Sequence, residues 1–252
     1  MKDIIPSKKQ SPILGLTGMG GGVGSNLGGS ADKKVYADDV FSTYLYTGNA
    51  TGSGSQTVNN GVDLSKGGLT WIKRRDGTYS NWLMDTVRGG TKMLSSNSTS
   101  GETTASGAIT SFNNNGFTLG AETQTNYLNL PYVSWTFRKA KGFFDIQTWS
   151  GNSTAGRQIS HDLESVPGCI MVKRLDSGSS NWIVYHRSIG NNVGGAGKGP
   201  EQQALWLNST SGQDESIEYW NNTPPTKDNF TLGIHPTVNQ NGGNYVAYIF
   251  AH

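Results

Sequence analysis

Four acidic residues stand in polar surroundings and are candidates for the carboxylate pairs that glycoside hydrolysis requires. They form two candidate pairs, Asp85 with Glu102 and Glu215 with Glu218. Two carboxyl groups a few ångströms apart would supply a general acid and a nucleophile or base. The chain carries an internal repeat, in which Asp85 falls opposite Tyr185 and Glu102 has no clear acidic counterpart. We therefore expect no catalytic residues and a protein that is not an enzyme.

Other chemistry-bearing residue types are sparse or badly spaced. His161, His186, His235 and His252 show no zinc-ligand spacing, and no local motif indicates a Ser-His-Asp arrangement. The 18 acidic residues are too scattered for a calcium site. We expect no metal and no cofactor. The single cysteine, Cys169, excludes an internal disulfide and is expected to be a small buried apolar residue.

Tryptophans beside polar residues could form a sugar-binding platform, because a pyranose offers a C–H face and a rim of hydroxyls. Asn81-Trp82 and Asn181-Trp182 fit this chemistry, but they fit equally a core tryptophan beside a turn-capping asparagine. Most tryptophans in small sandwiches belong to the core, so we favour the second interpretation for these pairs. Trp206 and Trp220 lack tryptophan counterparts in the other copy and are the better glycan-binding candidates.

A pair of basic residues occurs in both copies, followed in each case by an aspartate. The pairs are Lys73-Arg74 and Lys173-Arg174. One interpretation is a strand end whose charges pair across a hairpin, with little net stabilisation. The other is a partner-binding anchor against an acidic neighbour, since arginine is favoured at interfaces.

The elements that position these residues follow from a stretch of 22 residues that occurs twice. One copy spans residues 116–137 and the other spans 229–250, without a gap. Both begin with Phe-Thr-Leu-Gly, share one asparagine in the middle, and end with Tyr-Val-x-x-x-Phe. Each copy is predicted to form a strand, a polar loop and a second aromatic, β-branched strand. The repeated spacing indicates that the two strands meet in the fold.

Further repeated blocks extend the duplication to whole domains. Residues 68–76 match 168–176, Asn81-Trp82 matches Asn181-Trp182, and residues 97–101 recur letter for letter as 208–212. The spacing of strand residues and turn signals predicts a β-hairpin over 69–85 and another over 169–185. An insertion over 189–200 in the second copy is a candidate contact surface specific to that copy.

The fold class that follows is all-β, with two tandem antiparallel β-sandwich modules of jelly-roll or immunoglobulin-like type. We define module 1 as residues 36–140 and module 2 as residues 141–252. No segment shows a persuasive helical period, and we expect less than about 10% helix. Turn-forming Gly (35 residues) and an aromatic content of 10% agree with short strands around packed cores.

Charge and hydropathy exclude two classes of partner. The net charge of +2 is too small to indicate nucleic-acid binding. No apolar run has the length needed to span a bilayer, so we expect no membrane partner.

Residues 1–35 belong to neither module and are predicted to form an extended, glycine-rich anchoring arm. The arm combines a basic start, an apolar patch and glycines that let a backbone approach closely. Strand addition to a neighbour's sheet edge would satisfy its backbone amides and carbonyls. Its partner-binding candidates are Ile13, Leu14, Leu16, Met19, Gly20, Gly21 and Gly22.

Several motifs together resemble a domain family of virion structural proteins from marine bacteriophages, notably phages of cyanobacteria. The motifs lie at residues 15–22, 41–49, 85–92, 117–120 and 245–252. The resemblance implies a non-enzymatic structural protein of the virion, either a capsid decoration or a tail appendage component. Other virion proteins would be its partners, and we expect a homo-oligomer. The alternative function is a host-glycan-binding, lectin-like receptor-binding module. Family members are often longer, so we expect a short member or a truncated chain.

Overall fold

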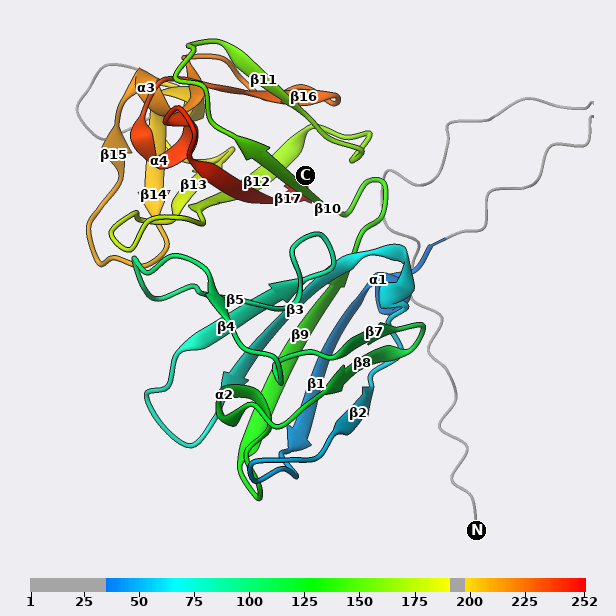
Figure 1. Cartoon of the computed structure of the whole chain (residues 1–252). Helices are drawn as coiled ribbons and strands as arrows, with labels where there is room; N and C mark the ends of the chain where they lie inside the picture. The colour runs from blue at the N-terminus through cyan, green and yellow to red at the C-terminus, as the bar shows by residue number, and fades with distance from the viewer. Residues whose placement is uncertain (1–34, 191–197) are drawn as a thin grey trace, which may run out of the picture.

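The structure, a computed structural model, describes residues 35–190 and 198–252 and is built mainly of antiparallel strands (Figure 1). The expected all-β class is confirmed, because the helices described are four single α-helical turns and two 3-10 turns. Of the predicted anchoring arm, residues 1–35, all but Val35 lies outside the described residues. Of the insertion over 189–200, residues 191–197 also lie outside them.

Module 1 consists of a six-stranded sheet that faces a three-stranded sheet across a hydrophobic core. The six strands lie in the order β1 (Phe41–Thr47), β9 (Pro131–Arg138), β3 (Gly68–Arg74), β4 (Asn81–Asp85), β5 (Gly89–Ser95) and β6 (Thr103–Thr104). The three strands lie in the order β2 (Gln56–Asn59), β8 (Gly116–Leu119) and β7 (Ser111–Asn113). The helical turns are α1 (Ala37–Val40), α2 (Thr123–Asn126) and the 3-10 turn η1 (Leu64–Lys66).

Module 2 has a six-stranded sheet with a corresponding strand order and a two-stranded sheet. The six strands are β10 (Phe144–Ser150), β17 (Asn244–Ala251), β12 (Pro167–Arg174), β13 (Ile183–His186), β14 (Gln203–Trp206) and β15 (Asp214–Glu215). The two strands are β11 (Arg157–Ser160) and β16 (Asn229–Leu232). The helical turns are α3 (Ile217–Trp220), α4 (Pro236–Asn239) and the 3-10 turn η2 (Pro200–Gln202).

The two strands of the repeated 22-residue stretch meet across the core and do not pair with each other. In module 1, β8 belongs to the small sheet and β9 to the large sheet. Phe117 and Leu119 from β8 nevertheless share a buried cluster with Tyr132 from β9. The segment between these strands, expected to be a polar loop, contains the helical turn α2.

The asparagine shared by both copies closes this segment by bonding to the backbone. Asn126 is fully buried, and its side-chain amide donates to the carbonyl of Gly120 at 2.8 Å. Its carbonyl oxygen accepts from the amide of Asn49 at 3.0 Å. Asn239 makes the equivalent bonds in module 2, to Gly233 at 2.8 Å and from Asn152 at 3.0 Å. A buried side chain that satisfies three or more backbone and side-chain groups explains why this residue type recurs.

The Thr/Ser-Gly-Asn motif that precedes this contact also has a steric reason to recur. A Cβ atom at Gly48 would lie 2.2 Å from the carbonyl oxygen of Tyr127, and one at Gly151 would lie 2.1 Å from that of Gln240. Only glycine lets the two backbone segments approach this closely. These residues, identical in the two copies, therefore have structural roles in each module.

The predicted hairpins are both present, but they differ in register by one residue. Ile72 lies opposite Trp82 in the β3–β4 pair, whereas Val172 lies opposite Ile183 in the β12–β13 pair. The connection in module 2 is thus one residue longer. The letter-by-letter alignment of Trp82 with Trp182 is wrong structurally, because a shift of one residue moves a side chain to the opposite face.

A third hydrophobic cluster lies between the two six-stranded sheets and takes residues from both. Leu69, Leu83 and Leu94 come from module 1, and Trp182 and Tyr248 come from module 2. All five are completely buried. The two modules therefore pack against each other through the sheet faces that point away from their own cores.

Candidate functional site

Trp220, one of the two tryptophans predicted to bind a glycan, lies in the core of module 2. Trp220 is only 2% exposed, and its indole nitrogen donates to the carbonyl of Gln203 at 2.9 Å. The expectation that Trp220 is exposed is wrong, because the α3 turn directs it against Tyr185 inside module 2. Trp206 is half-buried and packs against the same core. These two side chains do not form a joint exposed platform.

The repeated arginines form the ion pairs expected of a hairpin end. Arg74 Nε lies 2.5 Å from Asp76, and Arg174 Nε lies 2.7 Å from Asp176. The ammonium group of Lys73 donates a hydrogen bond to the carbonyl of Tyr79 at 2.9 Å, within the same turn. The first interpretation of these residues therefore accounts for their contacts, and surface pairs of this kind contribute little to stability.

Lys173 differs from Lys73, because it is fully buried between the modules. Its Nζ donates to the carbonyl of Thr99 in module 1 at 2.9 Å and to the carbonyl of Ser180. Burial lowers the pKa of Lys173 to about 8, since desolvation disfavours the charged form. Lys173 is thus a contact inside this chain and is unavailable to another protein.

The displaced pKa makes the stability of the protein depend on pH in a defined window. The pKa falls from 10.5 in the unfolded chain to about 8 in the folded chain. Between these values the unfolded chain holds a proton that the folded chain has released, so the free energy of unfolding should rise with pH. Urea titrations at pH 7.5, 9 and 10 would measure this rise. Lys173→Met should remove it, and parallel pH profiles for the two proteins would contradict the assignment.

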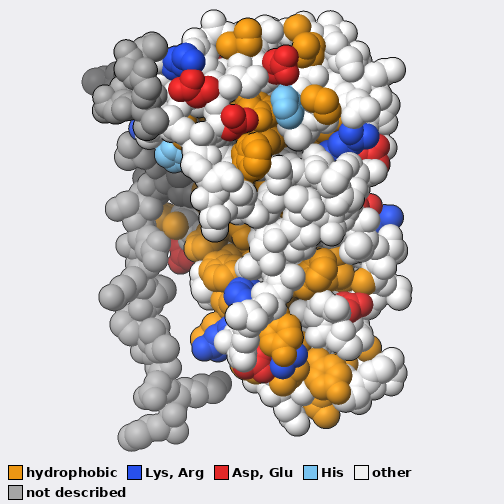
Figure 2. Space-filling view, turned by 90° about the vertical axis from the view of Figure 1, so that its left-hand side faces the viewer, with side chains coloured by type: hydrophobic (Ala, Val, Ile, Leu, Met, Phe, Trp, Pro, Cys, Tyr) orange, Lys and Arg blue, Asp and Glu red, His pale blue; other side chains and the backbone are white. Residues whose placement is uncertain are grey.

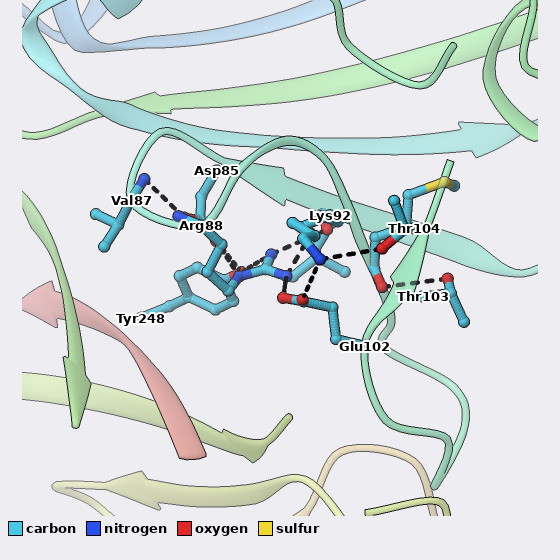
Figure 3. A network of polar contacts seen from close by, with 10 residues as sticks. Asp85, Val87, Arg88, Lys92, Glu102, Thr103, Thr104 and Tyr248 are labelled. Carbon is cyan, nitrogen blue, oxygen red and sulfur yellow. Dashed lines mark hydrogen bonds and ion pairs between the residues drawn. The ribbon is translucent and has the colours of Figure 1, made fainter. Parts of the chain in front are cut away.

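A network of buried charges lies where module 1 meets module 2 (Figure 3). Arg88, in the turn between β4 and β5, places its Nε 2.6 Å from Asp85 Oδ2 and its Nη1 3.0 Å from Glu102 Oε2. Its Nη2 donates to the hydroxyl of Tyr248, from module 2, at 2.9 Å. That hydroxyl donates in turn to Asp85 Oδ2 at 2.8 Å. Three residues of one module and one of the other therefore form a single hydrogen-bonded unit.

Asp85 has no free acceptor for a substrate. Its Oδ1 accepts the backbone amides of Val87 and Arg88 at 2.9 and 2.8 Å, and its Oδ2 accepts from Arg88 and Tyr248. Although burial opposes the charged form, Tyr248 and Asp85 raise the pKa of Arg88, so this side chain stays cationic. The first candidate carboxylate pair is brought together, but through a shared arginine in a buried ion-pair network.

The second candidate pair lies on module 2 beside η2. Glu215 and Glu218 line a cavity of about 320 Å³, and Lys198 Nζ lies 2.5 Å from Glu215. Glu218 also lies in the α3 turn, where the hydroxyl of Ser216 caps its backbone amide. Within the described residues, no group of three or more His, Cys, Asp or Glu side chains could hold a metal ion.

A groove on module 1 has features that sequence reasoning missed. Its volume is about 490 Å³. It lies between the β3–β4 turn and the α2 turn, and is lined by Arg74, Tyr79, Ser80, Trp82, Thr123, Gln124, Tyr127 and Leu130. In Figure 2, hydrophobic side chains come to the surface among charged ones on the lower half of the molecule, the half formed by module 1.

The aromatic side chains of this groove are unusually open to solvent. Tyr79 is 47% exposed and Tyr127 is 43% exposed, while Trp82 is half-buried. The guanidinium carbon of Arg74 lies 3.9 Å above the centre of the Tyr79 ring, in a cation–π arrangement. The ion pair with Asp76 holds the other side of the same guanidinium. The groove therefore presents aromatic rings beside fixed hydrogen-bonding groups.

Module 2 has no corresponding set of aromatic residues. Gln240 is the counterpart of Tyr127. The backbone amide of Tyr127 donates to the hydroxyl of Tyr132 at 3.0 Å, and that of Gln240 donates to the equivalent Tyr245 at 2.9 Å. The position of Trp82 is occupied by Ile183 through the register shift. Gln240 is exposed, and its side-chain oxygen accepts a hydrogen bond from Arg174. The sequence signal for the groove was that Tyr79 and Tyr127 have no aromatic counterpart in the second copy, where the matched residues are Ser179 and Gln240.

Comparison with known proteins places this arrangement in a family. Residues 37–252 match the family described as a domain of unknown function (DUF7483). The chain belongs to this family. The DUF7483 match runs through both six-stranded sheets, so it includes the buried network and the groove. No curated protein and no solved structure gives a significant match. No helix in the described parts of the chain is long and apolar enough to cross a membrane.

Proposed function

We propose that this chain is a non-enzymatic structural protein of a bacteriophage virion, acting as a capsid decoration or a tail appendage component. The observation that carries the proposal is the buried interface between the two modules. It combines a hydrophobic cluster with the Asp85–Arg88–Tyr248 network, so the modules are held as one body. A rigid block without a hinge between its halves suits a building unit of a large assembly.

We also propose that the two β-sandwich modules arose by duplication of one ancestral module. The corresponding strand orders of the large sheets support this, as do the equivalent contacts of Asn126 and Asn239. The differences between the modules then mark what changed after duplication. They lie in the register of one hairpin, the buried Lys173 and the aromatic groove.

Attachment to the particle is proposed to run through the N-terminal arm, with other virion proteins as partners and the chain as a homo-oligomer. The basic and apolar composition of the arm supports this, together with the internal contacts of the repeated Lys-Arg pairs. Lys173 already binds within the chain, which leaves fewer basic anchors on the modules. The contact residues of the arm would be Ile13, Leu14, Leu16, Met19, Gly20, Gly21 and Gly22.

Deletion of residues 1–34 tests this attachment. The truncated protein and the full chain would each be mixed with particles that lack the protein, and occupancy would be measured by quantitative mass spectrometry. The truncated protein should keep its circular dichroism spectrum and its thermal midpoint but should no longer join the particle. A full-chain Arg74→Ala variant, which changes a surface ion pair of module 1, should join normally. Incorporation of the truncated protein at the occupancy of the full chain would contradict the proposal.

Glycan binding is the second candidate function, and the groove on module 1 is the observation that favours it. The residues involved differ from Trp206 and Trp220, which do not form an exposed pair. A virion protein can carry both roles, because assembly would use the arm and recognition would use the groove.

A further inference from the structure

We infer that the groove between the β3–β4 turn and the α2 turn of module 1 binds a neutral glycan, with a pyranose ring stacked on Tyr127 or Trp82. This inference rests on the second candidate function, glycan binding, and names its ligand class; it does not depend on the proposed structural role. Its first support is the shape of the site. A concave surface of about 490 Å³ that combines apolar side chains with a few fixed polar groups is typical of small-ligand binding.

The second support is that the fold does not require an aromatic residue at the position of Tyr127, although Trp82 also packs against the core of module 1. Module 2 keeps the same scaffold with Gln240 where module 1 has Tyr127, and with the buried Ile183 where module 1 has Trp82. Gly243 is the counterpart of Leu130. The carbonyl of Leu130 accepts the amide of Gly48, and the carbonyl of Gly243 accepts the amide of the equivalent Gly151. Exposed aromatic surface that the fold does not need is a mark of a binding site.

The third support is the kind of polar group that surrounds the rings. Arg74 lines one side of the groove and has planar N–H donors. Gln124 has a side-chain amide that can both donate and accept. Adjacent sugar hydroxyls need donors and acceptors together, whereas the C–H face of the ring packs on an aromatic face.

The charge balance of the groove selects a neutral ligand over an anionic one. Arg74 is the only lining residue of the groove with a charge, and Asp76 pairs with it at 2.5 and 2.8 Å. The ion pair raises the pKa of Arg74 through its hydrogen bond to Asp76, and lowers the pKa of Asp76 by the same contact. With both groups charged, their sum is zero. A sulfated or sialylated glycan would therefore gain no net attraction here.

The test uses the full chain on an array of neutral gluco-, galacto- and manno-configured oligosaccharides. Sulfated and sialylated glycans and a proline-rich peptide are included as competing ligand classes. At least one neutral glycan should bind with a dissociation constant of about 1 mM or tighter, confirmed by calorimetry. Tyr127→Gln, which introduces the residue found in module 2, should weaken that binding by about tenfold or more.

Controls separate a site effect from a folding effect. Tyr44 lies on β1, is also exposed, and does not line the groove, so Tyr44→Gln should leave binding unchanged. Tyr79→Ser should also weaken glycan binding, while the thermal midpoint of the variant stays close to that of the unmodified protein. The inference is overturned if no neutral glycan binds, if binding survives both groove substitutions, or if an anionic glycan or the peptide binds instead. None of these outcomes bears on the particle-assembly experiment.

Discussion

Replacement of Arg88 by methionine should lower the free energy of unfolding by about 3–5 kcal/mol, because it leaves the buried Asp85 carboxylate without its cation. The substitution keeps most of the aliphatic volume and removes every hydrogen bond of the guanidinium, including those to Asp85, Glu102 and Tyr248. The side chains of Arg88 and Asp85 are 4% and 0% exposed, so water cannot replace the lost partner. Urea unfolding of the full chain at pH 7 would measure the loss.

Arg74 provides a matched control for this prediction. It forms an equally short ion pair with Asp76, but the side chains of that pair are 21% and 32% exposed. Arg74→Met should therefore change the free energy of unfolding far less than Arg88→Met does, because solvent screens an exposed pair. Equal losses of unfolding free energy for the Arg88 and Arg74 substitutions would show that the inter-module network stabilises the protein no more than a surface ion pair does.

Replacement of Trp182 by alanine should lower the free energy of unfolding by about 3–5 kcal/mol. Trp182 is completely buried between the two sheets and stacks on Tyr248 with ring centres 6.1 Å apart. Its indole nitrogen donates to the carbonyl of Ser95, in module 1, at 2.9 Å. The substitution thus opens a cavity and removes a hydrogen bond between the modules.

The half-buried Trp135 is the comparison residue for this prediction. It lies on β9 and meets Trp71 edge to face, and it belongs to none of the three buried clusters. Trp135→Ala should cost clearly less than Trp182→Ala in the same urea experiment. A larger loss at Trp135 would contradict the weight given to the buried Trp182.

The sequence was sufficient to predict the strands and both hairpins, because these rest on local patterns. Alternating apolar residues and turn signals place β3 and β4 within a residue or two of their observed bounds. The repeat also indicated which residues matter for the scaffold. Asn126 and Asn239, shared by both copies, are buried and hold equivalent backbone groups.

Contacts between the modules could not be predicted from the same patterns. Lys173 matches Lys73 in sequence, yet only Lys173 is buried, because the neighbouring module supplies the carbonyl of Thr99. The one-residue register shift likewise has no signature in the letters Asn-Trp, which occur in both hairpins. Tertiary packing decides the face on which each tryptophan lies.

One glycan candidate, Trp220, was misplaced for a related reason. Trp220 has no tryptophan counterpart in module 1, and that absence suggested a functional residue. The structure shows that it fills the core of module 2 against Tyr185. Absence from the other copy was a useful signal only in combination with exposure, as it is for Tyr127.

Calorimetric unfolding of the full chain tests most directly whether the two modules form one body. The interface cluster and the Arg88 network predict a single transition, with a calorimetric enthalpy equal to the van't Hoff enthalpy. Arg88→Met should lower the midpoint of that transition as a whole. Two separate transitions in the unmodified chain, with only one of them moved by Arg88→Met, would show that the modules are independent and would contradict the account.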